Sequence, residues 1–142
     1  MKNINSFLLI TFILLLMGAL SPTYAAEQKG GLFINLTTND TQASNKAIMF
    51  AHKKVLKSGY KPVAIWLNVK GIFLADKNRT EHASIQDKLS AFIKDGGIVI
   101  MCTACSKAAG LTSADYIDGV KMGNPDLVLG LLFDPAVKTL SF

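Results

Sequence analysis

The residue types best suited to chemistry in this sequence are its two cysteines, Cys102 and Cys105, in the segment Cys-Thr-Ala-Cys. Small oxidised domains that need covalent stabilisation use several bridges across long loops. A bridge between these two cysteines closes a very short loop, so it contributes little loop entropy to stability. We therefore interpret the pair as a reactive site.

The position of the pair favours this interpretation. Cys102 directly follows the apolar run 98–101, which we predict to be a buried strand, and the alanines after it favour a short helix. Ligands of open α/β sheets gather beyond the carboxyl ends of strands. The amide groups and dipole of such a helix would stabilise the Cys102 thiolate, the reactive form of cysteine. Cys105, one helical turn away, would serve as a resolving thiol.

Two other interpretations of the pair remain open: inert buried thiols and half of a metal site. No further ligand spacing accompanies the cysteines, so we predict no metal. His52 lies beside two lysines on a predicted exposed helix face, and His82 lies in an irregular charged stretch. We expect both histidines to be solvated surface residues. Trp66, within an apolar run, is expected in the core and not as a stacking platform.

A third interpretation is thiol–disulfide oxidoreduction of the thioredoxin type. A Cys-x-x-Cys motif after a strand and before a helix fits that mechanism. The motif here follows the third predicted strand, whereas thioredoxin-like domains carry it after an early strand. A redox role therefore stays as the second hypothesis.

Strands and helices alternate along the part of the sequence that must position the cysteines. We predict strands at about 32–36, 63–67, 98–101, 120–122 and 137–142, and helices at about 41–58, 85–95, 103–109 and 125–133. Residues 71–80 fit either a helical turn or a flap. This alternation predicts an α/β fold, a three-layer α/β/α sandwich with a mainly parallel sheet of about five strands.

The first residues have the pattern of a cleavable signal peptide. Lys2 provides the positive start, residues 7–20 an apolar stretch, and Thr23 to Ala25 a small-residue exit. The stretch is shorter than the ~18–20 residues that span a bilayer. We therefore expect a signal peptide at 1–25, one domain at 26–142, a periplasmic or secreted location and no stable membrane insertion after cleavage.

The charge of the chain is modestly positive. The net charge is +5, and loss of Lys2 with the signal peptide would lower it by one. The remaining positive charges are spread along the chain, apart from Lys53, Lys54 and Lys57 on one segment. A solvated helix face accounts for these lysines, so we predict no nucleic-acid partner.

The segment from Ile98 to Leu111, Ile-Val-Ile-Met-Cys-Thr-Ala-Cys-Ser-Lys-Ala-Ala-Gly-Leu, resembles the active-site region of the DsrE/DsrF-like family. That family's pattern is an apolar strand, a cysteine, a small-residue helix and a glycine eight residues after the cysteine, which Cys102 and Gly110 match. The opening strand with Thr-Thr-Asn-Asp and the closing Gly-Asn-Pro-Asp-Leu are also similar. The likeness covers nearly the whole chain after the signal peptide.

The resemblance implies a compact α/β/α sandwich, homo-oligomers or hetero-oligomers, and no cofactor. It implies that Cys102 carries sulfane sulfur as a persulfide between donor and acceptor proteins or small sulfane-sulfur compounds. The backbone amides of Thr103 and Ala104 would stabilise its charge, and Cys105 would release the sulfur. Asn39 and Asp40 follow the first strand, so they are further candidates for binding substrate at the same sheet edge.

Three hypotheses follow from the sequence. The first is an exported sulfur-trafficking protein with a persulfide on Cys102, which leaves open whether it is a sulfurtransferase or only a carrier. The second is a periplasmic thiol–disulfide redox protein that uses Cys102 and Cys105. The third is a non-catalytic binding or assembly module of the same fold.

Overall fold

The computed structural model describes residues 29–142, so the predicted signal peptide lies outside the described residues. Five strands form one sheet in the order β4-β3-β2-β1-β5, and every neighbouring pair is parallel. The strands are β1 (Gly31–Leu36), β2 (Val63–Leu67), β3 (Ile98–Met101), β4 (Lys121–Met122) and β5 (Val137–Ser141). The predicted parallel sheet of five strands is confirmed.

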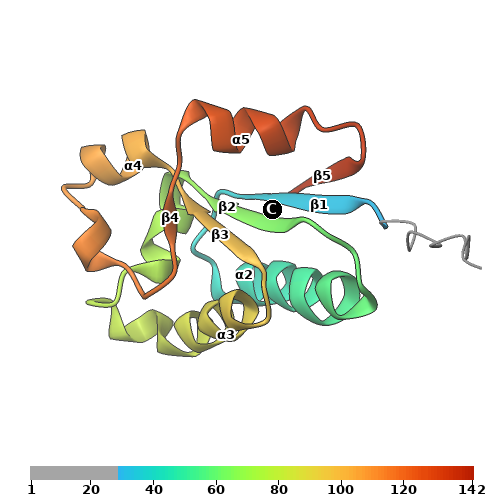
Figure 1. Cartoon of the computed structure of the whole chain (residues 1–142). Coiled ribbons are helices and arrows are strands. Elements are labelled where there is room, and N and C mark those ends of the chain that lie inside the picture. Colours follow the sequence, from blue (N-terminus) through green and yellow to red (C-terminus); the bar gives the residue numbers. More distant parts are fainter. Residues whose placement is uncertain (1–28) are drawn as a thin grey trace, which may run out of the picture.

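Helices cover both faces of the sheet, as expected for a parallel sheet. On one face lie α2 (Thr41–Met49), its continuation through η1 (Phe50–Val55) and η2 (Leu56–Ser58), and α3 (Ala83–Lys94). On the other face lies α5 (Pro125–Leu132) (Figure 1). Within residues 29–142, no helix combines the length and the apolar character that crossing a bilayer requires.

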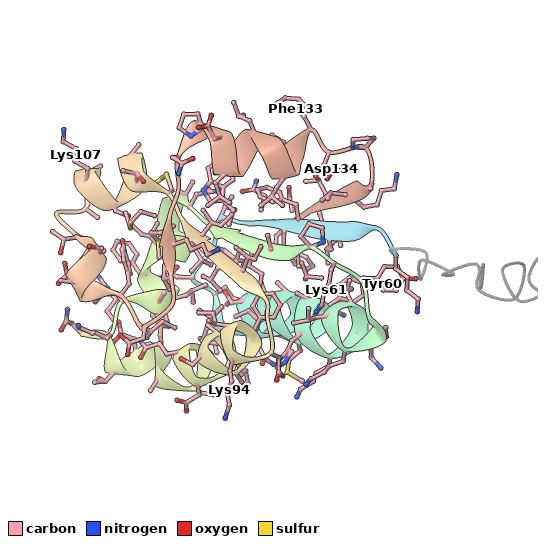
Figure 2. All side chains as sticks on the ribbon, viewed as in Figure 1. Tyr60, Lys61, Lys94, Lys107, Phe133 and Asp134 are labelled. Carbon is pink, nitrogen blue, oxygen red and sulfur yellow. A yellow bond between two sulfur atoms is a disulfide. The ribbon has the colours of Figure 1, made fainter. Side chains whose placement is uncertain are left out.

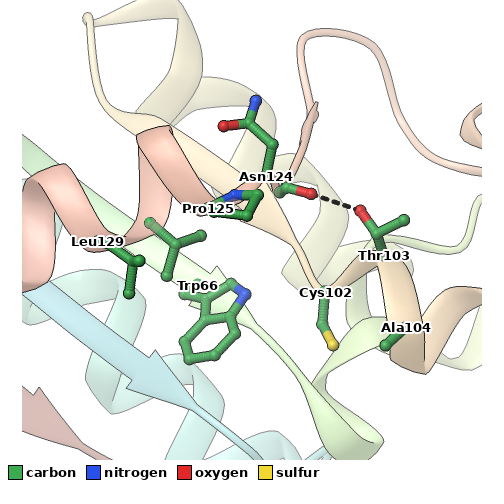
Figure 3. Close-up of a pocket in the computed structure, with 9 residues that line it drawn as sticks. Trp66, Cys102, Thr103, Ala104, Asn124, Pro125 and Leu129 are labelled. Carbon is green, nitrogen blue, oxygen red and sulfur yellow. Dashed lines mark hydrogen bonds between the residues drawn. The ribbon is translucent and has the colours of Figure 1, made fainter.

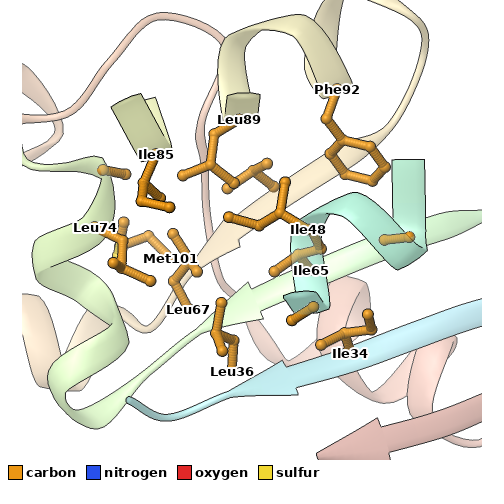
Figure 4. Close-up of a cluster of buried hydrophobic side chains, with 14 of the residues drawn as sticks. Ile34, Leu36, Ile48, Ile65, Leu67, Leu74, Ile85, Leu89, Phe92 and Met101 are labelled. Carbon is orange, nitrogen blue, oxygen red and sulfur yellow. The ribbon is translucent and has the colours of Figure 1, made fainter. Parts of the chain in front are cut away.

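The larger core lies between the sheet and the pair α2 and α3. Ile48 of α2 and Leu89 and Phe92 of α3 are fully buried, and they pack toward Ile34 and Ile65 of the central strands (Figure 4). On the opposite face, a smaller cluster of sheet residues lies under α5. Because the central strands are buried on both faces, their sequences are continuously apolar rather than alternating.

The first helical segment begins and ends where the sequence predicts. The Asp40 carboxylate accepts a hydrogen bond from the Ala43 backbone N–H at 2.7 Å, which satisfies one free amide of the first turn. At the other end Gly59 has a φ of +84°, a left-handed conformation that glycine adopts without strain. These two residues set the length of the segment that packs under β1 and β2.

The prediction that both histidines are surface residues is wrong. His52 is only 2% exposed and His82 only 6%. His52 lies on the buried stripe of its helix, four residues after Ile48, and its Nε2 is 2.6 Å from the Asp95 carboxylate. The neighbouring Lys53 and Lys54 are exposed, and their charges suggest a surface position for His52. The four-residue spacing from Ile48 instead indicates the buried face of the helix.

Asp95 ties the two helices of this face together. Its carboxylate contacts His52 and also lies 2.7 Å from Lys57 Nζ. The hydrogen bonds from Lys57 and His52 lower the pKa of Asp95 from its ordinary 3.8 to about 2. The carboxylate is therefore a charged link between η1, η2 and the end of α3.

Residues 71–80, for which the sequence allowed two interpretations, contain helical turns. A 3₁₀ segment, η3 (Val69–Ala75), follows β2, and a shorter one, η4 (Thr80–His82), leads into α3. Gly71 is buried against the Leu36 carbonyl, so that a Cβ at this position would overlap with that oxygen. This close approach holds η3 against the carboxyl end of β1.

Candidate functional site

Cys102 and Cys105 lie at the junction of β3 with α4 (Thr103–Ala108). The Cys102 backbone N–H donates to the Leu67 carbonyl at 2.9 Å, which continues the pairing of β3 with β2 for one residue beyond the strand. Its Sγ caps α4 by accepting from the Cys105 backbone N–H at 3.2 Å. Cys102 therefore stands at the carboxyl end of a central strand and at the first turn of a helix.

The two cysteines form a disulfide. Their Cα atoms are 5.3 Å apart, and each residue is half-buried. The sulfur atoms sit on one helical turn, which is the proximity that the Cys-x-x-Cys spacing predicts.

A chain of buried hydroxyl groups holds the first turn of α4 in position. Ser106 Oγ donates to the Cys102 carbonyl at 2.8 Å, and Tyr116 OH donates to Ser106 Oγ at 2.7 Å. Tyr116 is 3% exposed, and this burial raises the pKa of its phenol. Neither residue is among those predicted from the sequence, although Ser106 lies one helical turn after Cys102.

Val69 contacts the other sulfur of the pair. Its backbone N–H donates to Cys105 Sγ at 3.4 Å. Its φ is +50°, a left-handed conformation that is unfavourable for a β-branched residue, and its side chain is 60% exposed. A valine gives no sign of a left-handed backbone conformation, so this contact could not be predicted from the sequence.

A cavity of about 330 Å³ opens beside Cys102 (Figure 3). Trp66 from β2 forms one wall, and the first turns of α5 form the other. The cavity is lined by Trp66, Cys102, Thr103, Ala104, Gly123, Asn124, Pro125, Val128 and Leu129. The expectation that Trp66 belongs to the core holds for one side of its ring, which packs on Phe33 at 6.1 Å between centroids, but the residue is only half-buried.

Thr103 and Ala104 line the cavity beside Cys102, whereas Asn39 and Asp40 do not. Thr103 Oγ1 donates to the Gly123 carbonyl at 2.6 Å, which joins α4 to the segment that leads into α5. Asp40 uses its carboxylate to cap α2, and neither Asn39 nor Asp40 lines the cavity. They follow β1, which β2 separates from β3, and their role in substrate binding stays a prediction.

No metal centre accompanies the cysteines in the part of the chain that the structure describes. Among residues 29–142, no three His, Cys, Asp or Glu side chains come together in a way that would hold a metal ion.

The structure is that of a small α/β protein, a parallel sheet with helices on both faces and a cysteine pair at the carboxyl end of β3. The chain belongs to the DsrE/DsrF-like family, whose model matches residues 28–138. The resemblance noted in the sequence is thereby confirmed. Proteins of this family are generally implicated in sulfur relay.

Solved structures share the fold at low sequence identity. A protein of unknown function, BT1422 from Bacteroides thetaiotaomicron, has a TM-score of 0.65 at 19% identity, with 80% of this chain and 95% of that chain covered. MTH1491 from Methanobacterium thermoautotrophicum has a TM-score of 0.63 at 12% identity, covering 80% and 99%. The YchN protein from E. coli has a TM-score of 0.59 at 20% identity, covering 81% and 99%.

One curated relative is more similar in sequence over a shorter stretch. The uncharacterized protein MK0008 of Methanopyrus kandleri is 39% identical over 62 residues, which are 42% of this chain. The match spans about half, 51%, of the length of that relative.

Proposed function

We propose that this protein is an exported sulfur carrier that holds sulfane sulfur on Cys102 as a persulfide and passes it to an acceptor. The observation that carries the proposal is the half-buried Cys102 at the end of β3, whose Sγ caps the first turn of α4 and which lines a cavity. The sulfur-relay role of the family supports it. The free amide groups of that helical turn favour negative charge on Cys102 Sγ in the reduced protein.

Loading needs the reduced form of the pair. A dithiol reductant first opens the Cys102–Cys105 disulfide, as it becomes oxidised to its own disulfide. The Cys102 thiolate then attacks the outer sulfur of a donor persulfide, R–S–SH. The new bond joins Cys102 Sγ to that sulfur, the donor S–S bond breaks, and its electron pair leaves with R–S⁻. Atoms and charge balance, and the step involves no net oxidation.

Two routes release the sulfur. An acceptor thiolate can attack the outer sulfur, which returns Cys102 as a thiolate. Alternatively, the Cys105 thiolate attacks Cys102 Sγ and displaces HS⁻, so the sulfane sulfur is reduced as the two cysteines become a disulfide. The closeness of the two sulfur atoms supports the second route.

The test is mass spectrometry of the reduced, desalted protein after incubation with a sulfane-sulfur donor. We expect one added sulfur atom on Cys102 in wild type and in the Cys105→Ser variant, where the persulfide should persist longer. Cys102→Ser should give no adduct. Absence of the adduct in Cys105→Ser, where the second release route is blocked, or its survival in Cys102→Ser, contradicts the proposal.

The disulfide itself favours a second candidate, a periplasmic thiol–disulfide redox protein. That activity needs both cysteines, whereas sulfur loading needs only Cys102. Turnover of a model disulfide by wild type, its loss in Cys105→Ser, and no sulfur adduct in either protein would favour the redox role.

We propose export and self-association as parts of the same function. The sequence pattern of residues 1–25 supports export, and an exported protein whose first residue is Ala26 would verify it. Two exposed apolar side chains support a homo-oligomer: Phe133 projects from the end of α5 and is 76% exposed (Figure 2), and Leu140 on the edge strand β5 is 40% exposed. Light scattering that shows a monomer, unchanged in Phe133→Lys, would contradict self-association.

A further inference from the structure

We infer that the cavity beside Cys102 binds the uncharged, apolar organic group of a low-molecular-weight persulfide. This inference rests on the proposed function and names the class of donor that the same site accepts. The cavity of about 330 Å³ is at the small end of the range for ligand pockets, roughly 300–1,000 Å³. Its size suits a single ring or a short branched chain.

The lining of the cavity favours an uncharged occupant. Leu129 of α5 faces Trp66 of β2 across the cavity, with Pro125 at its upper end (Figure 3), and Val128 of α5 adds a further apolar lining residue. None of the nine lining residues carries a formal charge. A charged group that enters would lose its hydration without gaining an opposite charge. Polysulfide anions and the carboxylates of a peptide thiol are therefore disfavoured.

One polar group in this apolar lining lacks a partner. The indole Nε1 of Trp66 is buried and has no hydrogen-bond partner within the described part of the chain. The edge of the ring that carries this nitrogen faces Cys102 (Figure 3). A buried N–H donor without an acceptor is costly, so an acceptor supplied by a ligand would be bound favourably.

The loading step supplies such an acceptor. When the Cys102 thiolate attacks the outer sulfur, negative charge develops on the inner sulfur that leaves as R–S⁻. With the organic group between Trp66 and Leu129, the indole N–H donates to this leaving thiolate. Trp66 therefore contributes both an apolar wall for the donor and a hydrogen bond that strengthens as the S–S bond breaks.

The first experiment measures loading rates of the reduced protein with three donors: benzyl hydropersulfide, glutathione persulfide and inorganic polysulfide. The rate at which each donor loads the protein is divided by the rate at which the same donor reacts with a small thiol in solution. This ratio corrects for differences in the intrinsic reactivity of the donors. Burial of a phenyl group predicts that benzyl hydropersulfide is favoured by roughly tenfold or more. Loading without this preference overturns the inference and leaves the proposed function intact. No loading by any donor overturns the proposed function.

Two variants locate the preference in the cavity. Leu129 is 48% exposed, so Leu129→Lys places a positive charge at the wall without disturbing the core. We expect it to reduce the benzyl preference and to increase loading by polysulfide. Met49→Lys adds the same charge on α2, across the sheet, and should change neither rate. Equal effects of the two variants would contradict the inference.

Binding can also be measured without sulfur transfer. Trp66 is the only tryptophan of the chain, so its fluorescence reports on the cavity directly. The probe is benzyl methyl sulfide, which is unreactive, added to the oxidised protein. We expect a saturable change in emission that Leu129→Lys weakens and Met49→Lys does not. No saturable change would show that the cavity does not accept this class of ligand.

Discussion

The Val69 backbone N–H lies 3.4 Å from Cys105 Sγ, and it is held there by a left-handed backbone conformation at Val69. The first turn of α4 supplies an amide to Cys102 Sγ, so each sulfur of the pair accepts a hydrogen bond from a different backbone segment. The two sulfur atoms are therefore distinguished by their surroundings. Cys102 is held by its own helix, and Cys105 is held by η3.

Replacement of Val69 by glycine should stabilise the protein. The left-handed conformation costs an L-residue roughly 1–2 kcal/mol, and glycine adopts it freely. Greater freedom of the unfolded chain offsets roughly 0.4–1 kcal/mol of this gain. Because the Val69 side chain is exposed, little packing is lost. We expect a net gain of about 0.5–1 kcal/mol in urea unfolding of the oxidised protein. Val69→Ala keeps the left-handed cost and should gain less; lower stability of the glycine variant would contradict the prediction.

Asp95→Asn should lower stability at neutral pH, because asparagine cannot replace the charged link to His52 and Lys57. The folded-state pKa of Asp95, about 2, is below its ordinary value of 3.8. The contribution of the carboxylate is therefore fully present above pH 3.8 and lost as the pH falls toward 2. The difference in denaturation midpoint between wild type and variant should shrink over that range. Asp87→Asn, an exposed carboxylate on the same helix, is the control, and an equal effect there would refute the assignment.

Ser106 and Tyr116 should be energetically coupled. Ser106→Ala removes the acceptor of a buried phenol, which should cost about 1–3 kcal/mol, whereas Tyr116→Phe should cost about 1 kcal/mol. In the double variant no phenol is left without a partner. Its loss should therefore be smaller than the sum of the single losses by about 0.5 kcal/mol or more. Additive losses in chemical unfolding would show that the hydrogen bond contributes nothing.

Two glycine-to-alanine changes should have opposite signs. At Gly71 the new methyl group would overlap with the Leu36 carbonyl, so we expect a loss of about 1–3 kcal/mol as η3 moves away from β1. At Gly130, inside α5, the methyl group would meet nothing within 4 Å. Alanine there should add about 0.5–1 kcal/mol through helix propensity. Thermal unfolding of both variants measures the contrast, and a loss at Gly130 would show that α5 packs more tightly than described.

The architecture could be predicted because its strongest signals are local. Continuous apolar runs mark β2 and β3, and Asp40 and Gly59 bound the first helical segment. The reactive pair was found because strand, cysteine and helix follow one another directly in the sequence. Such signals need no knowledge of how distant parts of the chain meet.

The features that were missed depend on tertiary contacts. Trp66 and Leu129 form one cavity although they are far apart in sequence, and Val69 meets Cys105 only because η3 folds back over α4. His52 differs for another reason: its charged neighbours Lys53 and Lys54 indicate an exposed helix face, whereas its spacing from Ile48 places it on the buried face. The histidine is buried because the Asp95 carboxylate is there to receive it.

The pairing of β1 with β5 has a consequence for how the molecule is made. β1 precedes all other strands, yet one of its two edges is occupied by β5, which comes last. A polypeptide that emerges progressively from a ribosome or a translocation channel leaves that edge without its neighbour until Ser141 has appeared. During this interval the open edge is available to any extended chain nearby, so holdase chaperones would have their greatest effect before the final strand docks.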